Sequence, residues 1–311
     1  MQLRNVGQSG LRVAKVGLGC NNFGQSLDAP KSKRVIDAAI DAGVTFFDTS
    51  DVYGNRGGSE ECIGQALGER RQRVVLGTKF SMVMDNEGLT GGGSRSYVLR
   101  AVEASLRRLK TDWIDLYQIH FPDPRTPIEE TLRALDDLVT QGKVRYIGSS
   151  NFPAWQIADA AWVSRTTGRT AFVSAQNEYS LLFRGIEQEI LPAVRRFGLG
   201  FFPYFPLASG LLTGKYRAGS PPPPGSRFTT SPLGGRHKVY TDFDKIERLR
   251  AYASDHQRTL LELAMSWLAA QPGVSSVIAG ATRPEQVVSN AAAADWELDA
   301  SQLAEIDKLL A

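Results

Sequence analysis

The chain is poor in cysteine and histidine and lacks any long apolar segment. Its 311 residues include two cysteines and three histidines, too few cysteines for a disulfide framework, which favours a reducing compartment. The most apolar stretch, LGFFPYFPLASGLL, is short and is interrupted by Pro203 and Pro206, so it does not predict a membrane span. The N-terminus shows no apolar signal core. We therefore expect a cytoplasmic protein with no membrane partner.

Charge of one sign is also scarce. The net charge is +3, and the basic residues are spread along the chain without the Lys/Arg blocks typical of nucleic-acid binding. His120, His237 and His256 form no cluster with the spacing of metal ligands, which disfavours a metal-dependent hydrolase. The hydrophobic fraction of 42% is that of an ordinary globular protein with a large core. We expect neither a nucleic-acid partner nor a metal.

What the sequence does have is an alternation of short apolar runs and longer amphipathic ones. It predicts strands near 16–20, 44–48, 74–79, 114–120, 143–149, 172–176, 199–204 and 275–279. It predicts helices near 31–42, 59–69, 96–109, 127–140, 153–166, 187–197, 259–270 and 284–293. Eight such alternations indicate a single (β/α)8 barrel domain over residues 1–311. A doubly wound sheet is the alternative, but GLGCNNFG after the first strand lacks the G-x-G-x-x-G spacing.

The sequence also predicts elements outside the barrel and the residues at which several helices begin or end. An N-terminal hairpin is expected to turn at residues 8–10 and plug the barrel bottom, and extra helices are expected after the seventh strand and at the C-terminus. Residues 205–240 are too rich in proline and glycine to be regular. Ser59 is expected to N-cap its helix. The first position of two helices is expected at Pro127 and Pro284. Three helices are expected to end at Gly43, Gly142 and Gly198.

Four reactive side chains stand at or just after consecutive predicted strands: Asp48, Tyr53, Lys79 and His120. Each alone has a structural explanation, such as a cap, a surface aromatic, a solvated charge or a core histidine. Together, at strand ends that meet at one mouth of a barrel, they predict a catalytic site. Asp48 would pair a buried Lys79. The lysine would lower the pKa of Tyr53 from about 10 toward neutrality, making it a general acid, and His120 would hydrogen-bond the same substrate oxygen.

The chain resembles the aldo-keto reductases over essentially its whole length, including their potassium-channel β-subunit branch. The resemblance rests on seven motifs: FFDTSDVYG, GTKF, DLYQIH, IGSSNF, QNEYSLL, GLLTGKY and GATRPEQVVSN. It implies that Asp48, Tyr53, Lys79 and His120 form the family's catalytic tetrad, with Asp51 left for turn or substrate contacts. It also implies reduction of an aldehyde or ketone to an alcohol, with hydride from a nicotinamide cofactor.

Later strand ends carry the amides and hydroxyls that suit a carboxamide. The resemblance assigns Ser150, Asn151 and Gln176 to the nicotinamide, with Tyr204 stacked on its ring. Further cofactor contacts are expected after the last two strands, where barrels frequently bind phosphate, from Leu207, Ser209, Gly210, Leu211, Lys215, Gly280, Thr282, Arg283, Gln286 and Asn290. Of these, Ser209, Gly210, Leu211 and Lys215 are expected to line the pyrophosphate. Arg283 suits a 2′-phosphate, which favours NADPH over NADH. Two positions depart from the family: Gln286, where many relatives are basic, and Phe205, where serine is frequent.

Other functions stay open at this point. One is a cofactor-binding regulatory module, as in the potassium-channel β subunits, and another is a phosphate-binding barrel isomerase. A substrate pocket is expected between the loops 81–96 and 217–240, walled by Phe23, Tyr53, Phe80, Phe121 and Phe152. The sequence defines neither the carbonyl substrate nor the oligomeric state.

Overall fold

The computed structural model describes residues 1–85, 90–226 and 241–310. Eight parallel strands form one sheet in the order β10-β3-β4-β5-β6-β7-β8-β9. Phe201 in β9 forms a bridge with Val274, just before β10, so the sheet closes on itself. The strands are β3 (Val16–Gly19), β4 (Phe46–Asp48), β5 (Val75–Phe80), β6 (Ile114–Ile119), β7 (Val144–Ser150), β8 (Ser174–Glu178), β9 (Gly200–Tyr204) and β10 (Val277–Gly280). The predicted (β/α)8 barrel is confirmed, and the doubly wound alternative is wrong.

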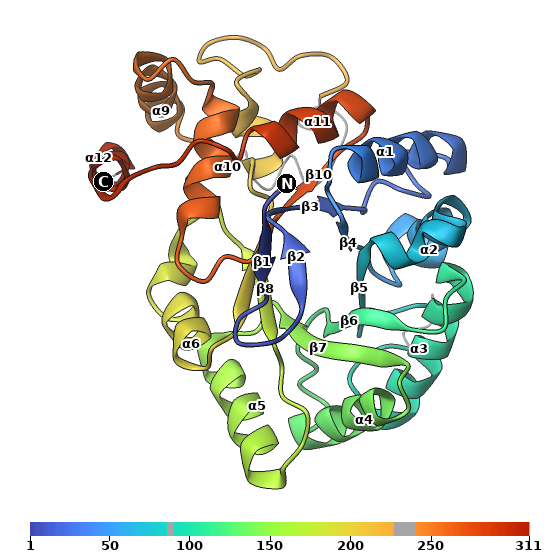
Figure 1. Ribbon diagram of the computed structural model, residues 1–311. Helices are drawn as coiled ribbons and strands as arrows, with labels where there is room; N and C mark the ends of the chain where they lie inside the picture. Colours follow the sequence, from blue (N-terminus) through green and yellow to red (C-terminus); the bar gives the residue numbers. More distant parts are fainter. Residues whose placement is uncertain (86–89, 227–240, 311) are drawn as a thin grey trace.

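Helices surround the barrel and alternate with its strands (Figure 1). They are α1 (Ala29–Asp41), α2 (Tyr53–Leu67), α3 (Arg95–Leu109), α4 (Ile128–Thr140), α5 (Ala154–Thr167), α6 (Ile190–Arg196), α10 (Leu260–Ala270) and α11 (Pro284–Ala292). Short 3-10 segments are η1 (Gly68–Arg73), η2 (Gly185–Glu187) and η3 (Ala208–Thr213). The extra helices predicted after the seventh barrel strand and at the C-terminus are confirmed as α9 (Phe243–Asp255) and α12 (Ala300–Leu310).

The N-terminal hairpin closes one end of the barrel, as predicted. Strands β1 (Leu3–Asn5) and β2 (Arg12–Ala14) pair antiparallel, and Figure 1 shows them crossing in front of the barrel. Apolar side chains of the hairpin pack on the inward-facing ones of the strands, in a cluster of Val6, Leu11, Val13, Phe46, Leu116, Phe202 and Ile278. The hairpin does not cover the opposite end of the barrel, where the carboxyl ends of the strands lie, and polar side chains gather there.

Local chemistry explains most helix boundaries. Gly43, Gly142 and Gly198 follow helices with φ of 75°, 74° and 67°, the left-handed conformation in which glycine ends a helix. Pro284 lies in the first turn of α11, as predicted. Pro127 is the N-cap residue of α4, one position before the first helical residue.

The start of α2 differs from the prediction. Residues 54–57 all have positive φ, so the helix begins with a kink just after Tyr53, which two glycines of this segment tolerate. Ser59 does not cap the helix, because its Oγ donates to the Cys20 carbonyl at 2.8 Å and lies 2.8 Å from Thr49 Oγ1. The kinked segment leaves Tyr53 beside the end of the barrel.

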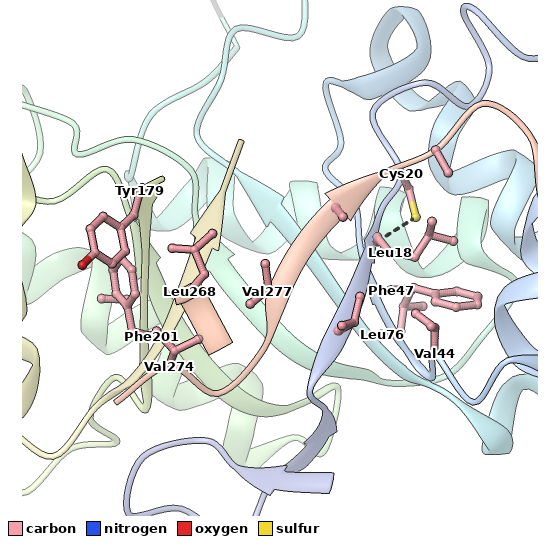
Figure 2. Close-up of a cluster of buried hydrophobic side chains, with 14 of the residues drawn as sticks. Leu18, Cys20, Val44, Phe47, Leu76, Tyr179, Phe201, Leu268, Val274 and Val277 are labelled. Atoms are coloured by element: carbon pink, nitrogen blue, oxygen red, sulfur yellow. Dashed lines mark hydrogen bonds between the residues drawn. The ribbon is translucent and has the colours of Figure 1, made fainter. Parts of the chain in front are cut away.

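The main hydrophobic core lies between the barrel and its helices. Figure 2 shows two parts of it, one near β3 and the other near β9 and β10. The first contains Leu18, Cys20, Val44, Phe47 and Leu76, and the second contains Tyr179, Phe201, Leu268, Val274 and Val277, all buried. Since this layer holds the strands from outside, the inward-facing residues at the strand ends keep fixed positions.

The proline-rich stretch 205–240 is described only in part. Its first portion contains η3 followed by turns, which agrees with an irregular segment, and residues 227–240 lie outside the described residues. Within the described ranges, none of the helices has both the length and the apolar character needed to cross a membrane.

Candidate active site

The carboxyl ends of the strands bring three of the predicted catalytic side chains to one mouth of the barrel. Asp48 ends β4, Lys79 lies one residue before the end of β5, and His120 follows β6. In the ladder Lys79 stands beside Gln118. Because side chains alternate along a strand, Asp48 shares the inward face of Phe46, two residues before it.

A buried ion pair lies at the centre of this mouth. Lys79 Nζ donates to Asp48 Oδ2 at 2.7 Å and to the Thr49 carbonyl at 2.9 Å. The side chains of Lys79 and Asp48 are 0% and 5% exposed. Two amides satisfy the other oxygen of the carboxylate: Gln176 Nε2 and Gln118 Nε2 donate to Asp48 Oδ1 at 3.0 and 3.4 Å. The predicted pairing is thus present, with a hydrogen-bond shell that a buried charge requires.

Tyr53 stands beside this pair. Its ring centroid is 5.3 Å from Lys79 Nζ and 5.6 Å from the His120 ring, which it meets edge-on. Burial, followed by the negative charge of Asp48, raises the pKa of Tyr53 well above its ordinary value. The prediction that Lys79 lowers this pKa is therefore wrong for the polypeptide, because Asp48 takes up the ammonium while burial penalises a tyrosinate. The phenol keeps its proton at neutral pH.

His120 is held from behind by a hydroxyl that the sequence did not single out. Ser50 Oγ lies 3.0 Å from His120 Nδ1 and donates to Asp51 Oδ1 at 3.1 Å. Burial, followed by the positive charge of Lys79, lowers the pKa of His120 well below its ordinary value. The imidazole is therefore neutral at physiological pH, and one of its nitrogens carries a proton.

Asp51 was expected to make turn or substrate contacts, but it lies beneath the surface at 1% exposure. Its Oδ2 accepts from the Tyr97 hydroxyl at 3.2 Å. Burial, followed by the negative charge of Glu60, raises the pKa of Asp51 to about 7. Of the two expected roles, the turn contact is present, because Asp51 lies in the turn after β4, whereas its 1% exposure leaves no surface for a substrate.

Asn151 links the strand ends on the predicted nicotinamide side. Its Nδ2 donates to the His120 carbonyl at 2.9 Å and to Ser150 Oγ at 3.1 Å, and its Oδ1 accepts from the Tyr204 hydroxyl at 2.7 Å. Three of the predicted nicotinamide residues are thereby brought together, and the fourth, Gln176, directs its amide to Asp48. Their contact with a nicotinamide stays a prediction.

The segment after β9 adopts an unusual backbone. Positive φ angles occur at Phe205 (54°), Ala208 (44°), Ser209 (57°) and Gly210 (99°), a conformation that non-glycine residues seldom adopt and that is concentrated at ligand sites. Leu207 and Leu211 belong to the same turn, and Lys215 follows it with an exposed side chain. The predicted cofactor contacts of Leu207, Ser209, Gly210, Leu211 and Lys215 stay a prediction.

The segment from β10 into α11 holds the remaining predicted cofactor residues. Gln286 Oε1 accepts from Thr282 N at 2.8 Å and Thr282 Oγ1 at 3.1 Å, so Gln286 caps the first turn of α11. Arg283 is exposed and Asn290 is buried. Gly280 is exposed, and a Cβ there would lie 3.6 Å from Asn22 Nδ2.

Asn22 lies next to Gly280, although the sequence analysis did not single it out. It lies in the loop after β3, and its Nδ2 donates to the Ala281 carbonyl at 3.3 Å. The paired asparagines in GLGCNNFG at a strand end were the available signal.

The predicted aromatic pocket is only partly present. Tyr53 is half-buried and Phe121, whose ring stacks on His120, is 44% exposed. The other three predicted wall residues, Phe23, Phe80 and Phe152, are at most 2% exposed. Phe80 stacks on Tyr117 in the layer between barrel and helices, because it follows the inward-facing Lys79 and so points outward.

Sequence comparison agrees with this geometry. A family model described as "Aldo/keto reductase family" matches residues 15–311. The chain belongs to the aldo/keto reductase family. It is 40% identical over 304 residues to a "Probable voltage-gated potassium channel subunit beta" of Oryza sativa subsp. japonica, covering 95% of this chain and 92% of the relative.

Two bacterial relatives from Bacillus subtilis (strain 168) are also similar. "Uncharacterized oxidoreductase YrpG" is 36% identical, covering 96% of this chain and 93% of the relative. "Aldo-keto reductase YhdN" is 31% identical, covering 100% and 94%. Membership of this family implies an oxidoreductase that acts on carbonyl compounds with a nicotinamide cofactor.

Proposed function

We propose that this aldo/keto reductase is an NADPH-dependent reductase of aldehydes or ketones in which Tyr53 donates the proton to the carbonyl oxygen. The convergence of Tyr53, His120 and the buried Lys79–Asp48 pair at one barrel mouth carries the proposal. A phenol, an imidazole and an ammonium within a few ångströms are the groups that stabilise and protonate an oxygen gaining negative charge.

Each of these side chains has a separate task. Tyr53 holds its proton at neutral pH, because burial raises its pKa. Lys79 supplies a positive charge near the phenol, and Asp48 fixes the ammonium in place. Neutral His120 offers a hydrogen bond beside the Tyr53 hydroxyl, and exposed Phe121 provides an apolar surface at the mouth.

The residues after β9 and β10 fit a phosphorylated dinucleotide. Lys215 and Arg283 are exposed cations. Among the described residues, and apart from its chain neighbours, no atom lies closer than 3.6 Å to the position of a Cβ on Gly280. Cations beside an open backbone suit phosphate groups. When bound, a reduced nicotinamide supplies the hydride. Ser150, Asn151, Gln176 and Tyr204 would hold it, and Arg283 would bind the 2′-phosphate that distinguishes NADPH from NADH.

Replacement of Tyr53 by phenylalanine tests the acid. With NADPH and a panel of aldehydes and ketones, the wild-type chain should consume the cofactor. Tyr53→Phe should lose at least about a hundredfold in kcat, the usual contribution of a positioned acid, yet bind NADPH with nearly unchanged affinity. Turnover by this variant at the wild-type rate would remove Tyr53 from the proton-donor role.

The cofactor preference is tested at Arg283. Arg283→Ala should weaken NADPH binding about tenfold or more and leave NADH binding nearly unchanged, because only NADPH carries the 2′-phosphate. Arg258→Ala, on an exposed arginine paired with Glu262, is a control. An equal effect of Arg283→Ala on both cofactors would contradict the assignment.

A second candidate function is a regulatory module that binds the cofactor and turns over slowly. The similarity to the rice relative named as a potassium channel subunit favours it. Steady consumption of NADPH over many turnovers supports the reductase, whereas tight NADPH binding with less than one turnover per bound cofactor across the panel supports the module.

A further inference from the structure

A chain of three buried polar groups leads away from the barrel mouth. His120 Nδ1 is 3.0 Å from Ser50 Oγ, and Ser50 Oγ is 3.1 Å from Asp51 Oδ1. The exposed fractions are 8% for His120, 0% for Ser50 and 1% for Asp51. Of these three groups, only His120 borders the position proposed for the carbonyl oxygen. Ser50 and Asp51 can therefore influence the reaction only through His120.

The Ser50 hydroxyl can donate only one hydrogen bond. Its hydroxyl has one proton to donate and lone pairs to accept with. A further acceptor, the Lys79 carbonyl, is farther away at 3.5 Å, and the Val52 amide donates weakly to Ser50 Oγ at 3.4 Å. The Ser50 proton therefore goes either to Asp51 or to His120 Nδ1, and the choice decides what the imidazole does.

We propose that Asp51, acting through Ser50, sets which ring nitrogen of His120 carries the proton. When Asp51 is ionised it accepts from Ser50, so Ser50 Oγ accepts from Nδ1–H and Nε2 is left with a lone pair. When Asp51 is protonated it donates to Ser50, Ser50 donates to Nδ1, and Nε2 carries the proton. Asp51 gains one proton between these states, and the proton counts of Ser50 and His120 are unchanged.

The contacts of Asp51 agree with this role. The Tyr97 hydroxyl donates to Asp51 Oδ2 at 3.2 Å or to the Met82 carbonyl at 3.3 Å. Oδ1 is the oxygen that lies within hydrogen-bond distance of Ser50, so a proton on Oδ1 is the one that Ser50 relays to His120. The charged and titratable groups around it are Glu60, Arg108, Tyr53, Tyr97 and Tyr117. Glu60 is itself tied to Arg108 at 2.7 Å. Burial, with Glu60 next, places the pKa of Asp51 at about 7, where both states are populated.

The consequence concerns the open nitrogen of His120. Among the residues that the structure describes, Nε2 has no hydrogen-bond partner, and it lies on the opposite side of the ring from Ser50. With Nε2–H, His120 donates to a carbonyl oxygen beside Tyr53. With a bare Nε2 it cannot. Ser50 and Asp51 are thus positioning residues for reduction, an inference that rests on the proposed function.

The test is nitrogen-15 spectroscopy of the full chain labelled at its three histidines, with the His120 signals assigned from their absence in His120→Gln. The nitrogen shifts of a neutral imidazole distinguish its two tautomers. In the wild-type chain, His120 should change from mainly Nε2–H to mainly Nδ1–H as pH rises through about 7. A single tautomer throughout this range would overturn the proposal.

Variants separate this coupling from other effects. Asp51→Asn and Ser50→Ala should abolish the change between about pH 6 and about pH 8. Tyr97→Phe should keep it but move its midpoint upward, because the Tyr97 hydrogen bond lowers the pKa of Asp51. An unchanged midpoint in Asp51→Asn, or a downward shift in Tyr97→Phe, would refute the proposed control by Asp51.

The spectra need no turnover, so they separate this inference from the reductase proposal. If the chain reduces no carbonyl and the tautomer still switches, only the reductase assignment fails. If it is an active reductase, wild-type kcat should fall above about pH 7, and Asp51→Asn should flatten that limb of the profile.

Discussion

Replacing Asp48 by asparagine removes the charge that holds Lys79 and keeps nearly the same side-chain shape. The ammonium of Lys79 has no exposed surface, so water cannot compensate for the lost carboxylate. Breaking one partner of a buried ion pair destabilises a protein by about 3–5 kcal/mol. We expect Asp48→Asn to reduce the free energy of unfolding by an amount in this range.

The hydrogen bonds around Asp48 add to the cost. An asparagine that turns its oxygen to Lys79 points its amide protons at Gln176 and Gln118, which both donate to the present carboxylate. Rotation of the Gln118 amide would relieve part of this conflict, since its Oε1 is buried and has no partner among the described residues. The Thr49 carbonyl still accepts from Lys79 at 2.9 Å, so the loss should not exceed the upper end of the range.

Urea unfolding at neutral pH measures the effect. Lys79→Met leaves the carboxylate unpaired instead, and the double variant removes both charges. The double variant should cost less than the sum of the single ones by about 2 kcal/mol or more, the mark of coupled neighbours. Glu103→Gln is the control, because it removes an exposed pair with Lys143 that is worth about 0–1 kcal/mol. A loss in Asp48→Asn no larger than in this control would refute the reasoning.

Two further predictions concern stability. A Cβ on Gly64 would overlap the Arg108 carbonyl oxygen and lie 2.7 Å from the Leu109 carbonyl carbon, so Gly64→Ala should force α2 from α3 and cost about 1–3 kcal/mol. Gly185→Ala should be nearly neutral, because in the described part of the chain no atom beyond its neighbours lies within 4 Å of a Cβ at this position; equal unfolding midpoints of the two variants would contradict this difference. Because folding raises the pKa of Asp51 from 3.8 to about 7, the folded chain binds more protons between these values, and stability is lost as pH rises through them. Relative to Asp51→Asn, the free energy of unfolding of the wild type should fall by about 4 kcal/mol between about pH 4 and about pH 8. Parallel curves of unfolding free energy against pH for the two chains would refute the raised pKa of Asp51.

The barrel and the ion pair could be predicted because each depends on local patterns. Apolar runs alternating with amphipathic ones determine strand and helix without knowledge of distant contacts. The position of Asp48 at a strand end, and that of Lys79 near the end of the next, follow from the same pattern. Parallel strands bring those ends together whatever the loops do.

The direction and the contacts of individual side chains were predicted less well than the strands and helices. Phe80 follows Lys79 by one residue and therefore faces the opposite layer, although both lie near the same strand end. Ser59 is a good cap by type, but the kink after Tyr53 carries it to Thr49 and Cys20. For Ser59 a tertiary contact decides which of several local possibilities is realised, whereas the outward direction of Phe80 follows from the alternation of side chains along β5.

The pKa values at the mouth show why depth matters for the chemistry. Burial favours the neutral form of every group, so it raises the pKa of Tyr53 and Asp51 and lowers that of His120. Lys79 and Asp48 lie 2.7 Å apart as a buried ion pair. Under the proposed function, a neutral carbonyl would enter without meeting a net charge. An oxygen that then gains negative charge would lie close to an ammonium and a phenol that are already in place, so little reorganisation would oppose the reaction.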